Sequence, residues 1–278
     1  MQTPVRTGQP NETLKPEAKE WHRGTKGTEA EVANPLEQFT IKRYAELGAG
    51  PVDAAFTNAS LFMLIILGLS FAFFWLGSRN AGIVPGRWQA ALEGVLGFVS
   101  GIVDENIGPK GKPFVPLIFS LFLFILFANM IGLIPYTFTV TSHIAVTFAF
   151  AALVFLICVI VGIARHGLHF FSMFVPANTP PVLLLLITPV ELISFLSRPL
   201  TLSIRLFANM TAGHILLKVF AGFIISLGAA GILAPLAVLP FGLTVAFYAL
   251  ELLVAVVQAY VFALLTCIYL NDSINLHH

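Results

Sequence analysis

Three stretches of nearly continuous apolar residues alternate with polar connections through the first two thirds of the chain. Each is about as long as the roughly 20 helical residues that cross a hydrocarbon core of about 30 Å. Thr141 and Ser142 precede the third stretch and predict its N-cap, because hydroxyl side chains accept hydrogen bonds from the first amides of a helix. We therefore predict three membrane-spanning helices, at residues 56–77, 114–133 and 144–164.

Residues 87–106 show a different pattern, in which apolar and polar side chains follow opposite faces of a helix. The apolar positions are Trp88, Ala91, Leu92, Val95, Val99, Ile102 and Val103, and the opposite positions are Gln89, Glu93, Gly97, Ser100 and Asp104. We predict an amphipathic helix that lies in the membrane interface. A crossing helix stays open as the alternative, if its polar stripe faces protein.

Two much longer apolar segments, residues 182–227 and 233–270, end the chain, and a Gly- and Ala-rich turn separates them. A helix of about 38 residues extends roughly 57 Å, nearly twice the hydrocarbon thickness. Such helices must tilt, kink or break, and the candidate kinks are Pro189 and Pro199 in the first segment and Pro235, Pro240 and Gly242 in the second. We predict a long, strongly tilted helical hairpin.

Together these patterns predict an all-α integral membrane protein with about five membrane-embedded helices and one interfacial amphipathic helix. The predicted organisation is a polar N-terminal extension and pre-membrane segment at residues 1–53, a membrane domain at 54–273 and a C-terminal tail at 274–278. The tilted hairpin occupies about residues 182–270 of the membrane domain.

The composition agrees with a membrane protein. The chain is 57% hydrophobic and 10% charged, with a mean hydropathy of +0.88, whereas soluble domains carry about 25% charged residues. Residues 1–53 hold 7 of the 15 Lys and Arg and 8 of the 14 Asp and Glu, so each charge beyond them needs its own explanation. A net charge of +1 gives no reason to expect a nucleic-acid partner. Cys158 and Cys267 lie in separate apolar runs and are expected to pack as small hydrophobes.

Positive residues in the connections predict the orientation of the chain. Connections that fall on one side of the membrane carry Arg79, Arg87, Lys110, Lys112 and Arg165. The opposite connections, residues 134–143 and 228–232, carry no Lys or Arg. The positive-inside rule then places the C-terminus in the cytoplasm and the N-terminus outside.

The final two segments hold a few ionisable side chains, and these are the candidates for chemistry. An arginine at the centre of a membrane helix costs at least about 2.5–3.5 kcal/mol, and apolar sequence continues on both sides of Arg205. An arginine that snorkels to the interface is the alternative interpretation. Arg198 lies closer to the cytoplasmic end and precedes Pro199, so structural and functional interpretations stay equally open for it.

Helical spacing groups the polar residues of these segments. At about 100° per residue, one stripe of the first segment holds Glu191, Arg198, Arg205 and Asn209, whereas His214 points roughly the other way unless the helix is kinked. On the second segment, Glu251 and Gln258 are seven residues apart and share a face.

His214 and Glu251 both lie toward the outer half of the hairpin, so the two are placed to meet across it. A buried imidazole and carboxyl group within reach of one another perturb each other's proton affinity, as a proton relay requires. A structural ion pair is the alternative.

Competing kinds of site find little support in the sequence. His166 and His169 are three residues apart, but no further ligand lies near them to complete a metal shell. We expect both to be loop histidines near the headgroups, and we expect neither a metal site nor a cofactor. Two alternative functions stay open: a metal-dependent membrane enzyme that uses these histidines, and a transporter in which Arg205 binds an anionic substrate.

Several segments resemble subunit a of F-type ATP synthases. The strongest is RPLTLSIRLFANMTAGHILL at residues 198–217, which resembles the family's signature. Supporting segments are NPLEQFTI at 34–41, FANMIGLIPYTF at 127–138, TPVELISFLSRP at 188–199 and ELLVAVVQAYVFALLTCIYLNDS at 251–273. The resemblance covers about residues 34–273 in the right order.

The resemblance implies a role for each candidate residue. Arg205 stands at the place of the family's essential arginine, which faces a carboxylate on the rotating ring of c subunits, and Asn209 and Gln258 match polar residues beside it. Where many bacterial members have Glu and His, this chain has His214 and Glu251, so the two residue types are exchanged. Glu191 matches an acidic residue toward the cytoplasmic end.

The resemblance also implies the function, namely the proton-translocating stator subunit of the Fo sector. Two offset half-channels are implied, one through His214, Glu251, Asn209 and Gln258 and the other near Glu191. The implied partners are the c-ring, b-type peripheral stalk subunits, the rest of the F1Fo complex and the lipid bilayer. The implied location is the bacterial inner membrane, with a mitochondrial-type inner membrane as the alternative.

Overall fold

The computed structural model describes residues 43–46, 55–79, 82–134, 137–167, 169–170 and 181–275. The predicted extension at residues 1–53 lies outside these residues except for 43–46, and so does the tail beyond residue 275. The proposed domain boundaries therefore stay a prediction.

Helices build the described part of the membrane domain, as predicted for an all-α membrane protein. They are α1 Asn58–Ser78, α2 Arg87–Asn106, α3 Val115–Gly132, α4 Ile144–His166, α5 Pro181–Ala229 and α6 Val238–Ile274. Short 3-10 helices connect several of them: η3 Gly108–Phe114, η4 Val140–Ser142 and η6 Gly231–Ala237. Two short antiparallel strands, β1 Arg43–Glu46 and β2 Ala55–Thr57, precede α1; no alternation in the sequence had indicated them.

Within the described residues, five helices are long and apolar enough to cross a membrane, and α2 is not one of them. This confirms the prediction of five membrane-embedded helices and a separate amphipathic helix. The spanning helices leave many large apolar side chains exposed, among them Leu64, Phe71, Leu156 and Ile160. Such surfaces suit a hydrocarbon environment, in which apolar side chains need no protein cover.

The start of α4 corrects the predicted N-cap. Thr141 and Ser142 lie in η4, and the N-cap residue is His143, which makes no side-chain capping bond. The amides of Val146 and Thr147 instead donate to the His143 carbonyl oxygen, at 3.0 and 3.1 Å. The Ser142 hydroxyl donates to the Thr139 carbonyl oxygen at 2.6 Å. It therefore stabilises the turn and accepts no hydrogen bond from the first amides of the helix.

Helix α2 places its apolar stripe against protein, because it packs on α1, α3 and α6. The buried residues of the predicted stripe are Leu92, Val99, Ile102 and Val103. At the start of the helix the assignment of Gln89 to the polar face is wrong, and Trp88 and Ala91 of the predicted stripe are exposed. Trp88 is 58% exposed, whereas Gln89 is buried and its amide nitrogen donates to the Gly82 carbonyl and to Glu93.

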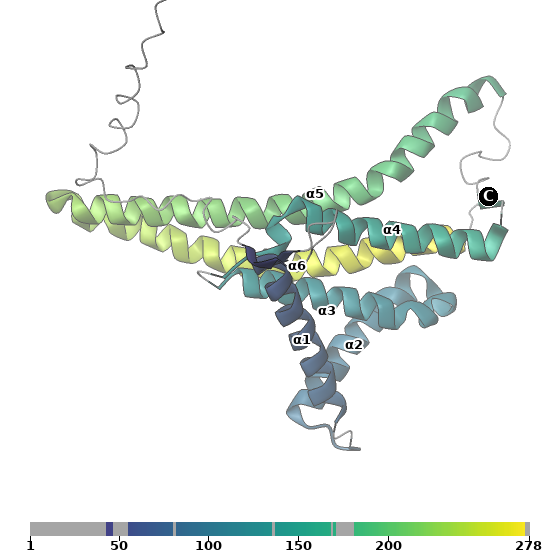
Figure 1. The fold of residues 1–278 in the computed structure, drawn as a ribbon, viewed down its shortest axis with the longest axis horizontal. Helices are drawn as coiled ribbons and strands as arrows, with labels where there is room; N and C mark the ends of the chain where they lie inside the picture. Colours follow the sequence, from purple (N-terminus) through teal and green to yellow (C-terminus); the bar gives the residue numbers. More distant parts are fainter. Residues whose placement is uncertain are drawn as a thin grey trace, which may run out of the picture. The chain divides into compact units, whose positions relative to one another are not determined.

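Helices α5 and α6 form a long hairpin through η6, in agreement with the two long apolar segments. Helix α5 stays continuous through Pro189 and Pro199, and Figure 1 shows that its first part runs at an angle to the remainder, which lies along α6. Pro235 lies in η6, where the chain turns. The tilt of the hairpin in a membrane stays a prediction.

The core that positions the hairpin lies where α3 packs along α6. Ala255, Ala259 and Ala263 are fully buried and four residues apart on α6, and small side chains at this spacing let two membrane helices approach closely. The same face of α6 carries Glu251 and Gln258, both buried. The packing of α6 against α3 therefore decides which side chains α6 turns away from lipid.

Candidate proton-relay site between the last two helices

Two polar contacts join α5 to α6 in the middle of the hairpin. The Nδ1 atom of His214 lies 3.5 Å from Oε1 of Glu251. The side-chain nitrogen of Asn209 donates to Oε1 of Gln258 at 3.0 Å. The helices run antiparallel, so the order of the contacts reverses along them: 209 precedes 214 on α5, and 258 follows 251 on α6. The structure thus brings together four of the residues that helical spacing had selected.

The His214–Glu251 pair is buried, with 7% and 5% of the two residues exposed. Gly213 makes room for the carboxyl group, because a Cβ atom at that position would lie 2.6 Å from Oε1 of Glu251. Neither carboxyl oxygen of Glu251 has a hydrogen-bond partner within the described part of the chain. A buried carboxyl group that faces an imidazole and lacks such partners is suited to exchanging a proton.

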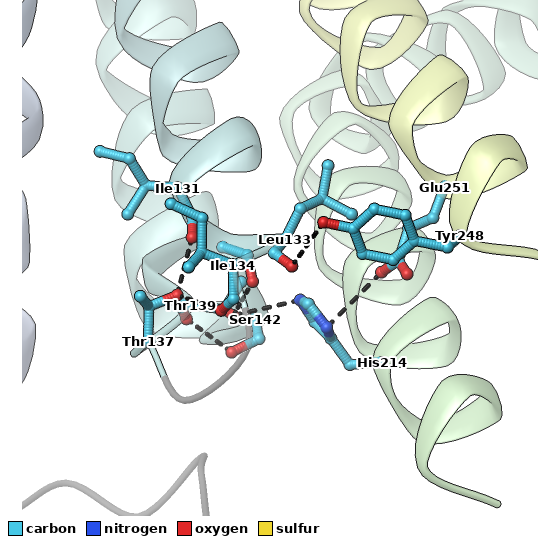
Figure 2. A network of polar contacts seen from close by, with 10 residues as sticks. Ile131, Leu133, Ile134, Thr137, Thr139, Ser142, His214, Tyr248 and Glu251 are labelled. Carbon is cyan, nitrogen blue, oxygen red and sulfur yellow. Dashed lines mark hydrogen bonds and ion pairs between the residues drawn. The ribbon is translucent and has the colours of Figure 1, made fainter. Parts of the chain in front are cut away.

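The other ring nitrogen of His214 meets a residue that sequence reasoning had missed. Its Nε2 atom lies 3.1 Å from the Thr139 hydroxyl oxygen, which reaches it from the turn between α3 and α4 (Figure 2). Nearby, the Tyr248 hydroxyl donates to the Leu133 carbonyl oxygen at 3.4 Å. Thr139 lies in an irregular turn without helical periodicity, so no pattern in the sequence had pointed to it.

Arg205 lies on the exposed face of α5, as does Asn209 four residues later. Its neighbour Ile204 is 43% exposed, so an apolar side chain lies beside Arg205 on this part of the helix. The opposite face is anchored, because Ser203 is fully buried and its hydroxyl lies 3.1 Å from that of Thr147 on α4. No carboxylate of the described residues lies within 4.0 Å of Arg205.

Arg198 has a partner inside the chain. Its Nη1 atom lies 2.7 Å from Oδ2 of Asp272, near the end of α6. The guanidinium also lies over the rings of Tyr269 and Phe195, at 5.2 and 5.6 Å from their centroids. This geometry favours the structural interpretation of Arg198, and Asp272 is a second partner that sequence reasoning had missed.

The remaining candidates lie apart from the relay. Glu191 is half-buried on α5, and no contact among the described residues joins it to His214 or Glu251. His166 faces the Ile274 carbonyl oxygen through Nε2 at 3.0 Å, where it ties α4 to the end of α6. The described residues contain no group of three or more His, Cys, Asp and Glu that could hold a metal ion.

Comparison with known proteins places the chain in a family. The family model described as ATP synthase A chain matches residues 60–271. ATP synthase subunit a of Rhodospirillum rubrum is 50% identical over 244 residues, which cover 88% of this chain and 99% of the relative. The subunits a of Pelagibacter ubique and Xanthobacter autotrophicus are 51% and 52% identical, again over 88% of this chain and 99% of each relative. With a family match across most of its length and a buried polar site between its last two helices, the chain belongs to the ATP synthase subunit a family.

Proposed function

We propose that this chain is the proton-translocating stator subunit of the Fo sector of a rotary ATP synthase, with Arg205 as a fixed charge that faces the c-ring between two offset half-channels. Membership of the ATP synthase subunit a family supports the Fo role and makes it the better choice over a transporter or a metal-dependent enzyme. The single observation that carries the finer proposal is the position of Arg205 on the exposed face of α5, beside Asn209 and the apolar side chain of Ile204.

The electrostatics of Arg205 require a partner from outside the chain. A guanidinium keeps its proton at any working pH, and a charge in a membrane helix is costly unless an opposite charge offsets it. The carboxylate of a c subunit would supply that charge. The exposed apolar residues beside Arg205 on α5, and Leu253 and Val257 on α6, would then form the surface on which the ring turns.

The outer half-channel would run through the two polar contacts of the hairpin. His214 is five residues after Asn209 on α5. A proton at His214 and Glu251 is therefore about 7.5 Å from Asn209 along the helix axis. The side-chain nitrogen of Gln258 is buried and lacks a hydrogen-bond partner among the described residues, which suits a step bridged by water. Asn209 is one helical turn from Arg205, where the rotor carboxylate would receive the proton.

The inner half-channel would open near Glu191. This residue is 14 positions before Arg205, or about 21 Å of helix, on the side opposite to His214. Because Arg205 repels a proton between the two routes, a proton would have to ride the ring from one route to the other. Each charge crossing the membrane potential supplies about 2.3 kcal/mol per 100 mV, which the rotation would convert into torque.

The proposed setting follows from this role. The partners would be the c-ring, b-type peripheral stalk subunits and the rest of the F1Fo complex. The chain is a multi-pass membrane protein, and we place it in the bacterial inner membrane with its C-terminus in the cytoplasm.

The test is Arg205→Ala in the assembled complex. ATP-driven proton pumping into inverted membrane vesicles should be abolished, while the complex should still purify with its c-ring. Arg198→Ala is the matched control, because it removes the same charge seven residues away on the same helix and should leave pumping in place. Normal pumping by the assembled Arg205→Ala complex would overturn the proposal.

A further inference from the structure

The hydroxyl group of Thr139 lies between two polar groups inside the protein. Its oxygen is 3.4 Å from the carbonyl oxygen of Gly132 and 3.1 Å from Nε2 of His214. The residue is 1% exposed. Figure 2 shows the hydroxyl on the side of the imidazole that faces away from Glu251.

The chemistry of these neighbours decides which atom donates. A carbonyl oxygen only accepts hydrogen bonds, so the Thr139 hydroxyl donates its hydrogen to the carbonyl oxygen of Gly132. The hydroxyl oxygen must then accept from His214, which puts the ring proton on Nε2. In the neutral ring this leaves Nδ1 without a proton, and Nδ1 is the atom that faces Oε1 of Glu251 at 3.5 Å.

Thr139 is itself held in place from two sides. Both the hydroxyl and the backbone amide of Ser142 donate to its carbonyl oxygen, at 2.6 and 3.2 Å. Its side chain packs against the end of α3, where a Cβ atom on Gly132 would lie 2.7 Å from Cγ2 of Thr139. The threonine therefore presents its hydroxyl to His214 in one fixed orientation.

We propose that Thr139 is a positioning residue of the relay, which holds His214 in the tautomer with the proton on Nε2 and the open nitrogen toward Glu251. The inference rests on the proposed function of His214 and Glu251. When the proton moves, the O–H bond of Glu251 breaks as an Nδ1–H bond forms, and an imidazolium and a carboxylate result. The Nε2–H group stays bonded to Thr139 throughout, so uptake and return both occur at Nδ1.

The opposite tautomer would stop this exchange. With the proton on Nδ1, the neutral imidazole presents a donor to Glu251, and a protonated carboxyl group there finds no acceptor nitrogen. Losing the Thr139 hydroxyl would leave both tautomers populated, and only one of them would accept a proton from Glu251.

The direct test measures the tautomer in the complete complex in lipid. Solid-state NMR of protein labelled with ¹⁵N-histidine distinguishes a protonated from an unprotonated ring nitrogen, and His214→Gln identifies the signals of His214. The wild type should show a protonated Nε2 and an unprotonated Nδ1 in the neutral ring. Thr139→Val should give a mixture of tautomers, and Thr139→Ser should restore the wild-type pattern. An unprotonated Nε2 in the wild type, or an unchanged pattern in Thr139→Val, would overturn the proposal.

Two further variants separate positioning from general damage. Thr141→Val removes a buried hydroxyl from the same turn, and that hydroxyl has no hydrogen-bond partner in the described part of the chain, so the tautomer should stay unchanged. Gly132→Ala keeps the Thr139 hydroxyl but displaces it, so it should mix the tautomers as Thr139→Val does. A wild-type pattern in Gly132→Ala would argue against the proposal.

Proton pumping by the same variants links the tautomer to function. Thr139→Val should pump several-fold more slowly than the wild type, and Thr139→Ser at close to the wild-type rate. Mixed tautomers with normal pumping would overturn the role of Thr139 in the relay. His214→Ala tests the proposed relay by itself: if it pumps normally, the relay fails whatever the tautomer is.

Discussion

His214 and Glu251 should act on one proton-transfer step, and the test is a double-mutant cycle. The perturbations are His214→Ala, Glu251→Ala and the two together. If the proton passes between the two side chains, either single change removes the step. The second change then has little left to remove, so the double mutant should be slower than the worse single mutant by only a small factor.

The magnitude of the coupling follows from the geometry. Residues in direct contact usually couple by about 0.5–3 kcal/mol, which is about 2-fold to 150-fold in a rate. The two side chains lie 3.5 Å apart and are 9% and 6% exposed, so water and salt screen their interaction little. We therefore expect the upper half of that range, with the double mutant at least about 20-fold faster than the product of the single effects predicts.

The assay is the initial rate of ATP-driven proton pumping into inverted vesicles, together with passive proton conduction after F1 is removed. Both rates are normalised to the amount of assembled complex. The control cycle combines His214→Ala with Asp272→Asn, because Asp272 is 21 residues of helix from Glu251, or about 31 Å. Distant sites usually act independently, so the control effects should multiply. Effects of His214→Ala and Glu251→Ala that also multiply would refute the shared step.

Two further predictions concern stability in detergent. Asp272→Asn should lower the melting temperature only slightly, since an ion pair whose side chains are 22% and 29% exposed contributes about 1 kcal/mol or less. Arg198→Ala should lower the melting temperature more than Asp272→Asn does, because the guanidinium also lies over Tyr269. A larger decrease in Asp272→Asn than in Arg198→Ala would contradict this account. His143 is stacked on Phe138, and burial lowers its pKa from 6.5. The folded state then favours the neutral ring, so stability should fall as the pH drops below about 6.5, and a melting profile with the same pH dependence in His143→Gln would count against this reasoning.

Much of the fold was predictable because length and hydropathy decide it locally. A bilayer needs about 20 apolar residues for each crossing, and the predicted stretches agree with α1, α3 and α4 to within a few residues. The predicted N-cap of α4 was wrong because the turn before the helix decides what the Ser142 hydroxyl binds. It donates to the turn, and the first amides of α4 are left to a backbone carbonyl. Gln89 was assigned to the wrong face because Gly82, in the connection between α1 and α2, supplies the backbone partner that lets Gln89 be buried.

The candidate site was predictable only along each helix. Spacing placed Glu251 and Gln258 on one face of α6, and both are buried. It also placed His214 away from Arg205, and the structure buries the first and exposes the second. No spacing rule relates α5 to the turn between α3 and α4, so Thr139 could not be selected.

The amino-acid sequence by itself determined the number of membrane helices, the hairpin and the few charges that apolar surroundings make costly. These follow from local chemistry, namely the length of an apolar run and the expense of a charge within it. Only the tertiary structure decided which polar groups meet. Arg198 pairs with Asp272 and Arg205 faces outward, although both are arginines seven residues apart on one helix. The physical reason is packing: the contacts of α6 and of the turn at Thr139 determine which side chains on α5 find a partner inside the chain.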